Sequence, residues 1–148
     1  MSTSLISARV TLWVNRCIAV LVLVLLPALP FLLNWYSTVR VLSPSEYLAI
    51  IIAFYCCAVV TGIALWQMDC LLRNILDDQV FVEKNVRCIR GIRLCCALIS
   101  LICLPAAFVY MPLWFMVIIM AFLALVVTVV GQVMKAAVAI REENDLTI

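Results

Sequence analysis

Four long apolar runs dominate the sequence and restrict how the chain can fold. A helix needs about 20 apolar residues to cross roughly 30 Å of hydrocarbon, so four crossings take up more than half of the 148 residues and leave only short segments between them. Hydrophobic residues make up 68% of the chain and charged residues 12%, whereas soluble domains have about 45–50% and about 25%. The sequence therefore predicts an all-α integral membrane protein, a four-helix transmembrane bundle that forms one domain over residues 1–148.

Aromatic and capping residues mark the ends of the predicted spans. Trp13 and Trp35 are separated by about 33 Å along a helix, which matches the two interfaces of a bilayer. Ser43, Pro44 and Glu46 form a capping-box pattern at the start of the second helix. The spans are expected at about residues 11–34, 44–70, 88–109 and 112–134, with a polar turn at about 71–87 and a tail at 135–148.

Basic residues are distributed unevenly between the two sides of this arrangement. The side with both termini and the polar turn holds nine of the ten Lys and Arg residues, and the other side holds only Arg40. Positively charged loops stay in the cytoplasm, so both termini are expected there. The helical pattern continues past Trp66 and past Met134, which predicts helix ends that project into the cytoplasm.

The start of the third helix carries the main candidate contact residues. Lys84, Arg87, Arg90 and Arg93 recur every three residues, which spreads them over about half of the helix circumference. These side chains would contact anionic lipid head groups or the acidic surface of a cytoplasmic partner. The positive-inside rule alone also accounts for such charges, so both interpretations stay open.

A stripe of small and branched residues follows on the opposite face of this helix. It comprises Cys88, Ile92, Cys95, Ile99 and Cys103, at spacings of three and four residues. Such spacing places side chains on one face of a helix, and small side chains allow two membrane helices to approach closely. This face is therefore predicted to pack against another span.

No pattern of catalytic, cofactor-binding or metal-binding residues is present in the sequence. The chain has no histidine, its eight cysteines contain no C-x-x-C pair, and no ionisable residue lies at mid-depth of a span. Asp69 precedes Arg73 by four residues, the favoured order for a structural ion pair on a helix. The neutral polar residues within the spans are expected to join neighbouring helices; they are Thr61, Ser100, Thr128 and Gln132.

Two stretches resemble a family of bacterial membrane proteins, the one grouped as domain of unknown function 2975. They are the turn DDQVFVEKNVRCIRGI and the terminal REENDLTI. Val82 departs from this resemblance, since Ser or Thr is expected there to cap the third helix. The residues that carry the resemblance are Phe81, Glu83 and Asn85 in the turn, and Asp145, Leu146, Thr147 and Ile148 in the tail.

The resemblance implies a non-enzymatic protein of the bacterial inner membrane. Members of the family are often encoded beside a small helix-turn-helix regulator of the Xre type, which implies a regulatory or sensory partner of such a transcription factor. Direct contact with nucleic acid and a cofactor are not expected. The docking surface would comprise Phe81, the basic start of the third helix, and the tail residues Asp145, Leu146 and Ile148.

Two other functions are compatible with the sequence. A small transporter or exporter subunit, assembled as a homo-oligomer, would need a polar cavity near Thr61, Ser100, Thr128 or Gln132. A redox protein would use the adjacent pairs Cys56-Cys57 or Cys95-Cys96. The absence of a C-x-x-C pair disfavours the redox function, because membrane cysteines commonly serve as small apolar residues.

Overall fold

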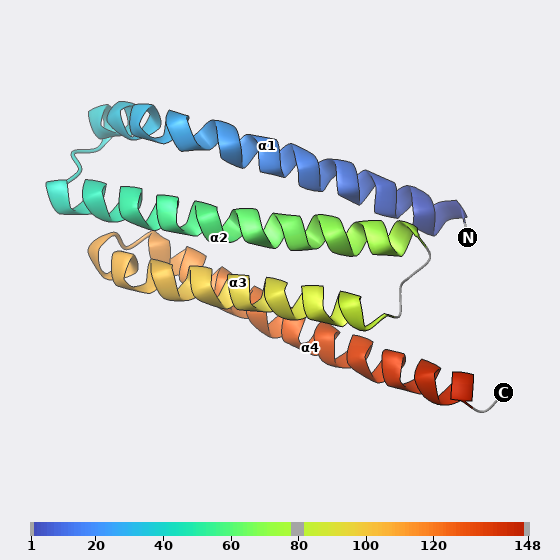
Figure 1. Ribbon diagram of the computed structural model, residues 1–148. Coiled ribbons are helices and arrows are strands. Elements are labelled where there is room, and N and C mark those ends of the chain that lie inside the picture. The colour runs from blue at the N-terminus through green and yellow to red at the C-terminus, as the bar shows by residue number, and fades with distance from the viewer. Residues whose placement is uncertain (1, 78–81, 147–148) are drawn as a thin grey trace.

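The computed structural model describes the backbone of residues 2–77 and 82–146, and the side chains of residues 7–77, 82–141 and 143. The described elements are helices, which confirms the all-helical class. Each of them is long and apolar enough to cross a membrane, which indicates a multi-pass membrane protein. Successive helices run in opposite directions (Figure 1). The helices are α1 (Ser2–Val39), α2 (Pro44–Leu76), α3 (Glu83–Val109) and α4 (Leu113–Leu146).

The helices are longer than the predicted spans. Helices α2 and α4 have 33 and 34 residues, or about 50 Å each, which exceeds the roughly 30 Å hydrocarbon layer of a bilayer. Most of the predicted polar turn at 71–87 is helical, because α2 continues to Leu76 and α3 begins at Glu83. The expectation that helical structure continues beyond the apolar runs is therefore confirmed.

The four helices form an open row instead of the expected bundle. Among the described residues, Cα atoms of consecutive helices approach within 8 Å, and those of non-consecutive helices do not. Figure 1 shows α1, α2 and α3 side by side in this order, with α4 crossing behind α3. Lipid covers apolar helix faces as well as another helix does, so the hydrophobic effect gives no reason for α1 and α4 to meet.

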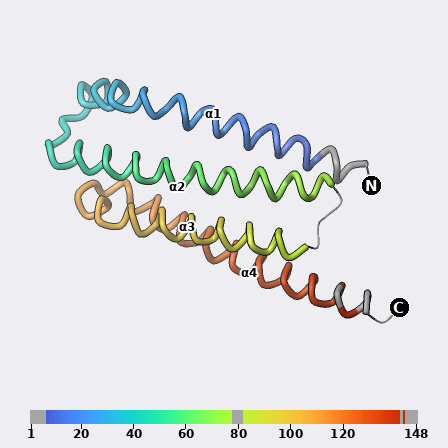
Figure 2. The backbone as a smooth tube through the Cα atoms, in the orientation of Figure 1, coloured from blue at the N-terminus to red at the C-terminus, as the bar shows by residue number. Residues whose placement is uncertain are grey.

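Figure 2 shows the N-terminal part of α1, the end of α2, the start of α3 and the C-terminal part of α4 at one end of the row. We call this end the terminal end, and we call the opposite end, with the α1–α2 and α3–α4 connections, the loop end.

At the loop end, the hydroxyls of Tyr36 and Tyr110 lie 3.3 Å apart, and the Arg40 guanidinium lies 5.5 Å from the centre of the Tyr110 ring. The hydrogen bond with Tyr36 is the main cause that raises the pKa of Tyr110, and burial raises it further. This phenol therefore stays neutral at pH 7.

The start of α2 has the predicted capping box. The Ser43 Oγ accepts a hydrogen bond from the Glu46 N–H over 3.3 Å, and the Glu46 carboxylate accepts one from the Ser43 N–H over 2.8 Å. Pro44 occupies the first turn, where its missing N–H costs nothing. Helix α3 begins after Val82 without a side-chain cap, as the departure from the family pattern at this position predicts.

Helix α3 forms the packing centre of the row. Ile99, Cys103 and Ala107 of α3 make a buried cluster with Val117 of α4, and the Cys103 sulfur lies 3.5 Å from that of Cys57 in α2. The predicted stripe therefore is the packing face of α3. Its members Cys95, Ile99 and Cys103 are buried, and Cys88 and Ile92 are half-buried.

Two prolines shape the second half of α1. Pro27 and Pro30 lie inside the helix, and Figure 1 shows its last turns at an angle to the rest. The Leu26 carbonyl would bond the N–H of residue 30, which proline lacks. Instead it accepts a hydrogen bond of 2.9 Å from the Tyr55 hydroxyl of α2. The neighbouring helix thus satisfies the carbonyl that the proline leaves free, as hydrocarbon requires.

Replacing Tyr55 by Phe should therefore lower the free energy of unfolding by about 0.5–1.5 kcal/mol, because the Leu26 carbonyl loses its partner. The measurement is unfolding of the purified protein in mixed micelles as the fraction of sodium dodecyl sulfate rises. In a Pro30→Ala background the helix regains the N–H that bonds Leu26, so Tyr55→Phe should cost little there.

Tyr47→Phe is the matched control, because Tyr47 lies in the same helix and its hydroxyl makes no hydrogen bond within the described residues. It should leave the unfolding curve in place. If Tyr55→Phe lowers the free energy of unfolding equally with and without Pro30→Ala, the hydroxyl does not compensate for the N–H that Pro30 lacks.

Candidate functional site

The predicted contact residues of α3 lie at the terminal end of the row. Lys84, Arg87 and Arg90 are exposed, and Arg93 is half-buried. Within the part of the chain that the structure describes, none of the four forms an ion pair. Their positive charges are therefore free to act on a ligand or a partner.

Asp69 holds two other arginines at this end. Its carboxylate lies 2.7 Å from Arg73 Nε, four residues later in α2, and 3.4 Å from Arg16 Nε of α1. The Asp69 side chain is only 16% exposed, so the two cations compensate a partly buried charge. The i,i+4 spacing predicts Arg73, whereas Arg16 is 53 residues away and is brought in by the packing of α1 on α2.

Two asparagines join α2 to α3 where the chain reverses. The Asn74 amide donates a hydrogen bond of 2.8 Å to Asn85 Oδ1. Asn85 is fully buried, and Asn74 is 8% exposed. A buried amide without a partner costs about 1–3 kcal/mol, so this contact favours one arrangement of the last turn of α2 against the first turns of α3. This arrangement also sets the position of the basic side chains, because they belong to the same turns of α3.

A third asparagine joins α1 to α2 near the same end. Asn15 is 7% exposed, and its amide donates to the Leu65 carbonyl over 3.1 Å. Sequence reasoning missed Asn15 and Asn74, and it noted Asn85 only through the family resemblance. The available signal is an asparagine within an apolar helical stretch, because a buried amide needs a hydrogen-bonding partner.

The neutral polar residues of the spans differ in their roles. Ser100 of α3 donates to the Val117 carbonyl of α4 over 3.0 Å, so its expected role between helices is confirmed. Thr128 donates to the Ala124 carbonyl of its own helix over 2.6 Å, so the same expectation is wrong for Thr128. Threonine hydroxyls readily bond the carbonyl four residues earlier, which satisfies them locally.

The other predicted contact residues lie wholly or partly outside the described part of the chain. Phe81 and Ile148 lie outside the described residues, as do the side chains of Asp145 and Leu146. All eight cysteines are free. Within the described ranges, no group of three or more Cys, Asp or Glu residues could hold a metal ion.

Replacing Asn74 by Ala should lower the free energy of unfolding by about 1–3 kcal/mol, because Asn85 Oδ1 loses a buried donor. Asn34→Ala, at an exposed position of α1, should change it far less. The measurement is again unfolding in mixed micelles. If the two substitutions cost the same, the amide pair does not hold the reversal.

Comparison with known protein families shows to which family this chain belongs. The family model described as "Protein of unknown function (DUF2975)" matches residues 8–148, which include most of α1, the other three helices and the whole candidate site. No curated protein and no solved structure matches the chain. The resemblance carried by the turn and the tail is thereby confirmed: the chain belongs to the family of proteins of unknown function designated DUF2975.

Proposed function

We propose that this protein is a non-enzymatic regulatory or sensory component of the bacterial inner membrane. Its terminal end lies in the cytoplasm and binds a helix-turn-helix transcription regulator of the Xre type. The observation that carries this proposal is the exposed basic surface at the start of α3, where Lys84, Arg87 and Arg90 form no ion pair within the described residues.

Charge supports the orientation. Nine of the ten basic residues belong to the terminal end, and cytoplasmic segments of membrane proteins carry such an excess. The ends of α2 and α4 supply folded surface there, since each helix of about 50 Å exceeds the hydrocarbon layer by roughly 20 Å. A soluble partner would thus meet ordered helix ends instead of a short loop.

The arrangement of charges supports a protein partner. Asp69 already pairs with Arg16 and Arg73, whereas the exposed bases of α3 have no such acid among the described residues. Complementary charge steers association and selects partners, so the partner surface would be acidic. The net charge of the whole chain is only +2, which gives little support to direct binding of nucleic acid.

A transporter subunit has less support. Ser100 and Thr128 donate their hydroxyl hydrogens to backbone carbonyls, so both serve helix structure and packing. The cavity that Thr128 and Gln132 line lies near the terminal end, and neither Thr61 nor Ser100 borders it. A path across the membrane would need polar groups along the whole length of the helices.

Photo-crosslinking in the native host tests the partner proposal. A photoreactive amino acid replaces Lys84 in one strain and Arg87 in another, and the captured proteins are identified by mass spectrometry. Both positions should capture the same Xre-type regulator. Adding Arg90→Glu should reduce capture at Lys84 roughly tenfold, because a like charge then faces the acidic partner.

Val41 is the control position, because it is 93% exposed and lies at the loop end, outside the cytoplasm in this proposal. It should capture no regulator. Recovery of the regulator from Val41, or of only lipid or copies of this chain from Lys84 and Arg87, would contradict the proposal.

A further inference from the structure

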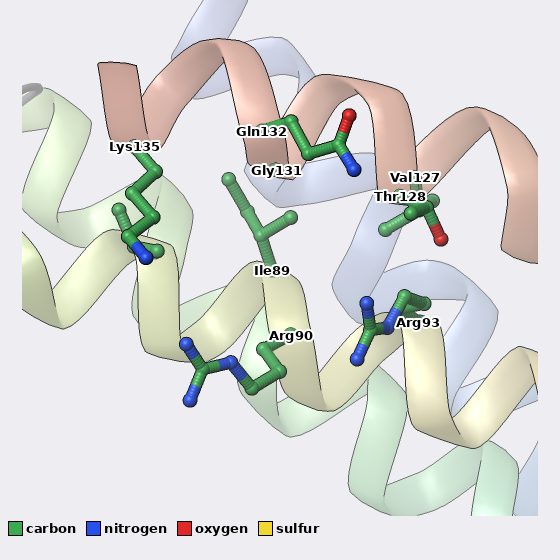
Figure 3. A pocket seen from close by; sticks show the side chains of 9 residues that line it. Ile89, Arg90, Arg93, Val127, Thr128, Gly131, Gln132 and Lys135 are labelled. Carbon is green, nitrogen blue, oxygen red and sulfur yellow. The ribbon is translucent and has the colours of Figure 1, made fainter. Parts of the chain in front are cut away.

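A cavity of about 180 Å³ lies between α3 and α4 near the terminal end. Arg90 and Arg93 of α3 and Lys135 of α4 line it, together with Gln132. Figure 3 shows Lys135 extending from α4 toward α3, the Arg93 guanidinium beside α3, and Ile89 between these two side chains, while Gln132 lies along α4. Arg90 stands at the α3 rim with its guanidinium directed away from α4 in this view.

The cavity is lined by positively charged side chains. From Lys84 to Arg141 the chain has no Asp or Glu, and none of the described residues that line the cavity is acidic. Within the described residues, none of its three cations forms an ion pair. Neighbouring like charges repel, and a bound anion would remove that repulsion.

The depth of the cavity distinguishes it from a surface patch. Lys135 lies about 32 Å along α4 from Trp114, at the far boundary of a roughly 30 Å hydrocarbon layer. Arg93 lies about 24 Å along α3 from Val109, which places its backbone inside that layer. A cation whose backbone lies inside that layer either extends its side chain to the interface or takes a partner, and a bound phosphate would be such a partner.

The lining combines polar and apolar groups in a way that fits a lipid. Ile89 and Val127 border the same cavity as the cations, so acyl chains can leave it along apolar helix surface. The guanidinium of Arg93 can donate two parallel hydrogen bonds to a phosphate, and Lys135 adds a point charge. Gln132 supplies the neutral donor, because the Thr128 hydroxyl already donates to the Ala124 carbonyl.

We propose that this cavity binds the phosphate of an anionic phospholipid. Arg93 donates hydrogen bonds to the phosphate, Gln132 donates to one of its oxygens, and Lys135 adds positive charge from the opposite helix. Zwitterionic phospholipids bind less well, because no carboxylate among the described lining residues can pair with their ammonium group. The proposal depends on the membrane depth of the cavity and does not depend on the regulator.

Native mass spectrometry of the purified full-length protein in detergent tests the site, with phosphatidylglycerol and phosphatidylethanolamine as competing probes. The wild type should prefer phosphatidylglycerol, and the variant Arg93→Gln/Lys135→Gln should bind it about 30-fold more weakly, as expected for two lost charges near a head group. Gln132→Leu keeps every charge and should weaken binding roughly threefold to tenfold, the effect of one neutral hydrogen bond.

The control variant is Arg9→Gln/Arg141→Gln. It removes the same charge from two exposed positions outside the cavity, and it should keep the wild-type preference. Equal loss in the control and the cavity variant, or a wild type without preference, would overturn the proposal. Displacement of phosphatidylglycerol by millimolar inorganic phosphate would also overturn it, since the occupant would then be a soluble anion.

Discussion

The bilayer imposes the constraint on which the rest of the structure depends. Hydrocarbon offers no hydrogen bonds, so each span must satisfy its own backbone, and four apolar helices are the result. Hydrocarbon also covers apolar side chains as well as protein does, so the helices need not close into a bundle. The open row is a direct consequence, with α3 packed between α2 and α4, and α1 in contact with α2.

Polar groups hold this row together where apolar contacts cannot specify it. The Tyr55 hydroxyl replaces the N–H that Pro30 lacks, and Asn15 bonds a carbonyl of α2. At the terminal end, the bond between Asn74 and Asn85 joins α2 to α3. Because the same turns of α3 carry the basic residues, that bond also holds those charges at the terminal end.

Local signals made much of the fold predictable. Ser43 and Glu46 form the predicted capping box, and the apolar runs predict the four helices because hydropathy and helical period are properties of neighbouring residues. The packing face of α3 follows from its Cys and Ile spacing for the same reason. The continuation of α2 past Trp66 and of α4 past Met134 was predictable as well, because the helical pattern continues there.

Contacts between distant residues could not be predicted. Arg16 reaches Asp69 only because α1 packs on α2, and Tyr55 reaches Leu26 only because both helices are present. The cavity needs Arg93 of α3 and Lys135 of α4 to border the same space, which the spacing of either helix alone does not determine. Closure of the row was wrongly expected, because a soluble bundle closes to bury apolar surface and a membrane protein has no such need.

The central claim is that the four helices cross the membrane with the terminal end in the cytoplasm, and paired reporters test it directly. Alkaline phosphatase, which is active only outside the cytoplasm, and green fluorescent protein, which fluoresces only inside it, are each fused after Ile148 and inserted after Val41. The account predicts fluorescence with an inactive phosphatase at Ile148, and an active phosphatase without fluorescence at Val41. The reverse pattern, or the same pattern at both sites, would contradict it.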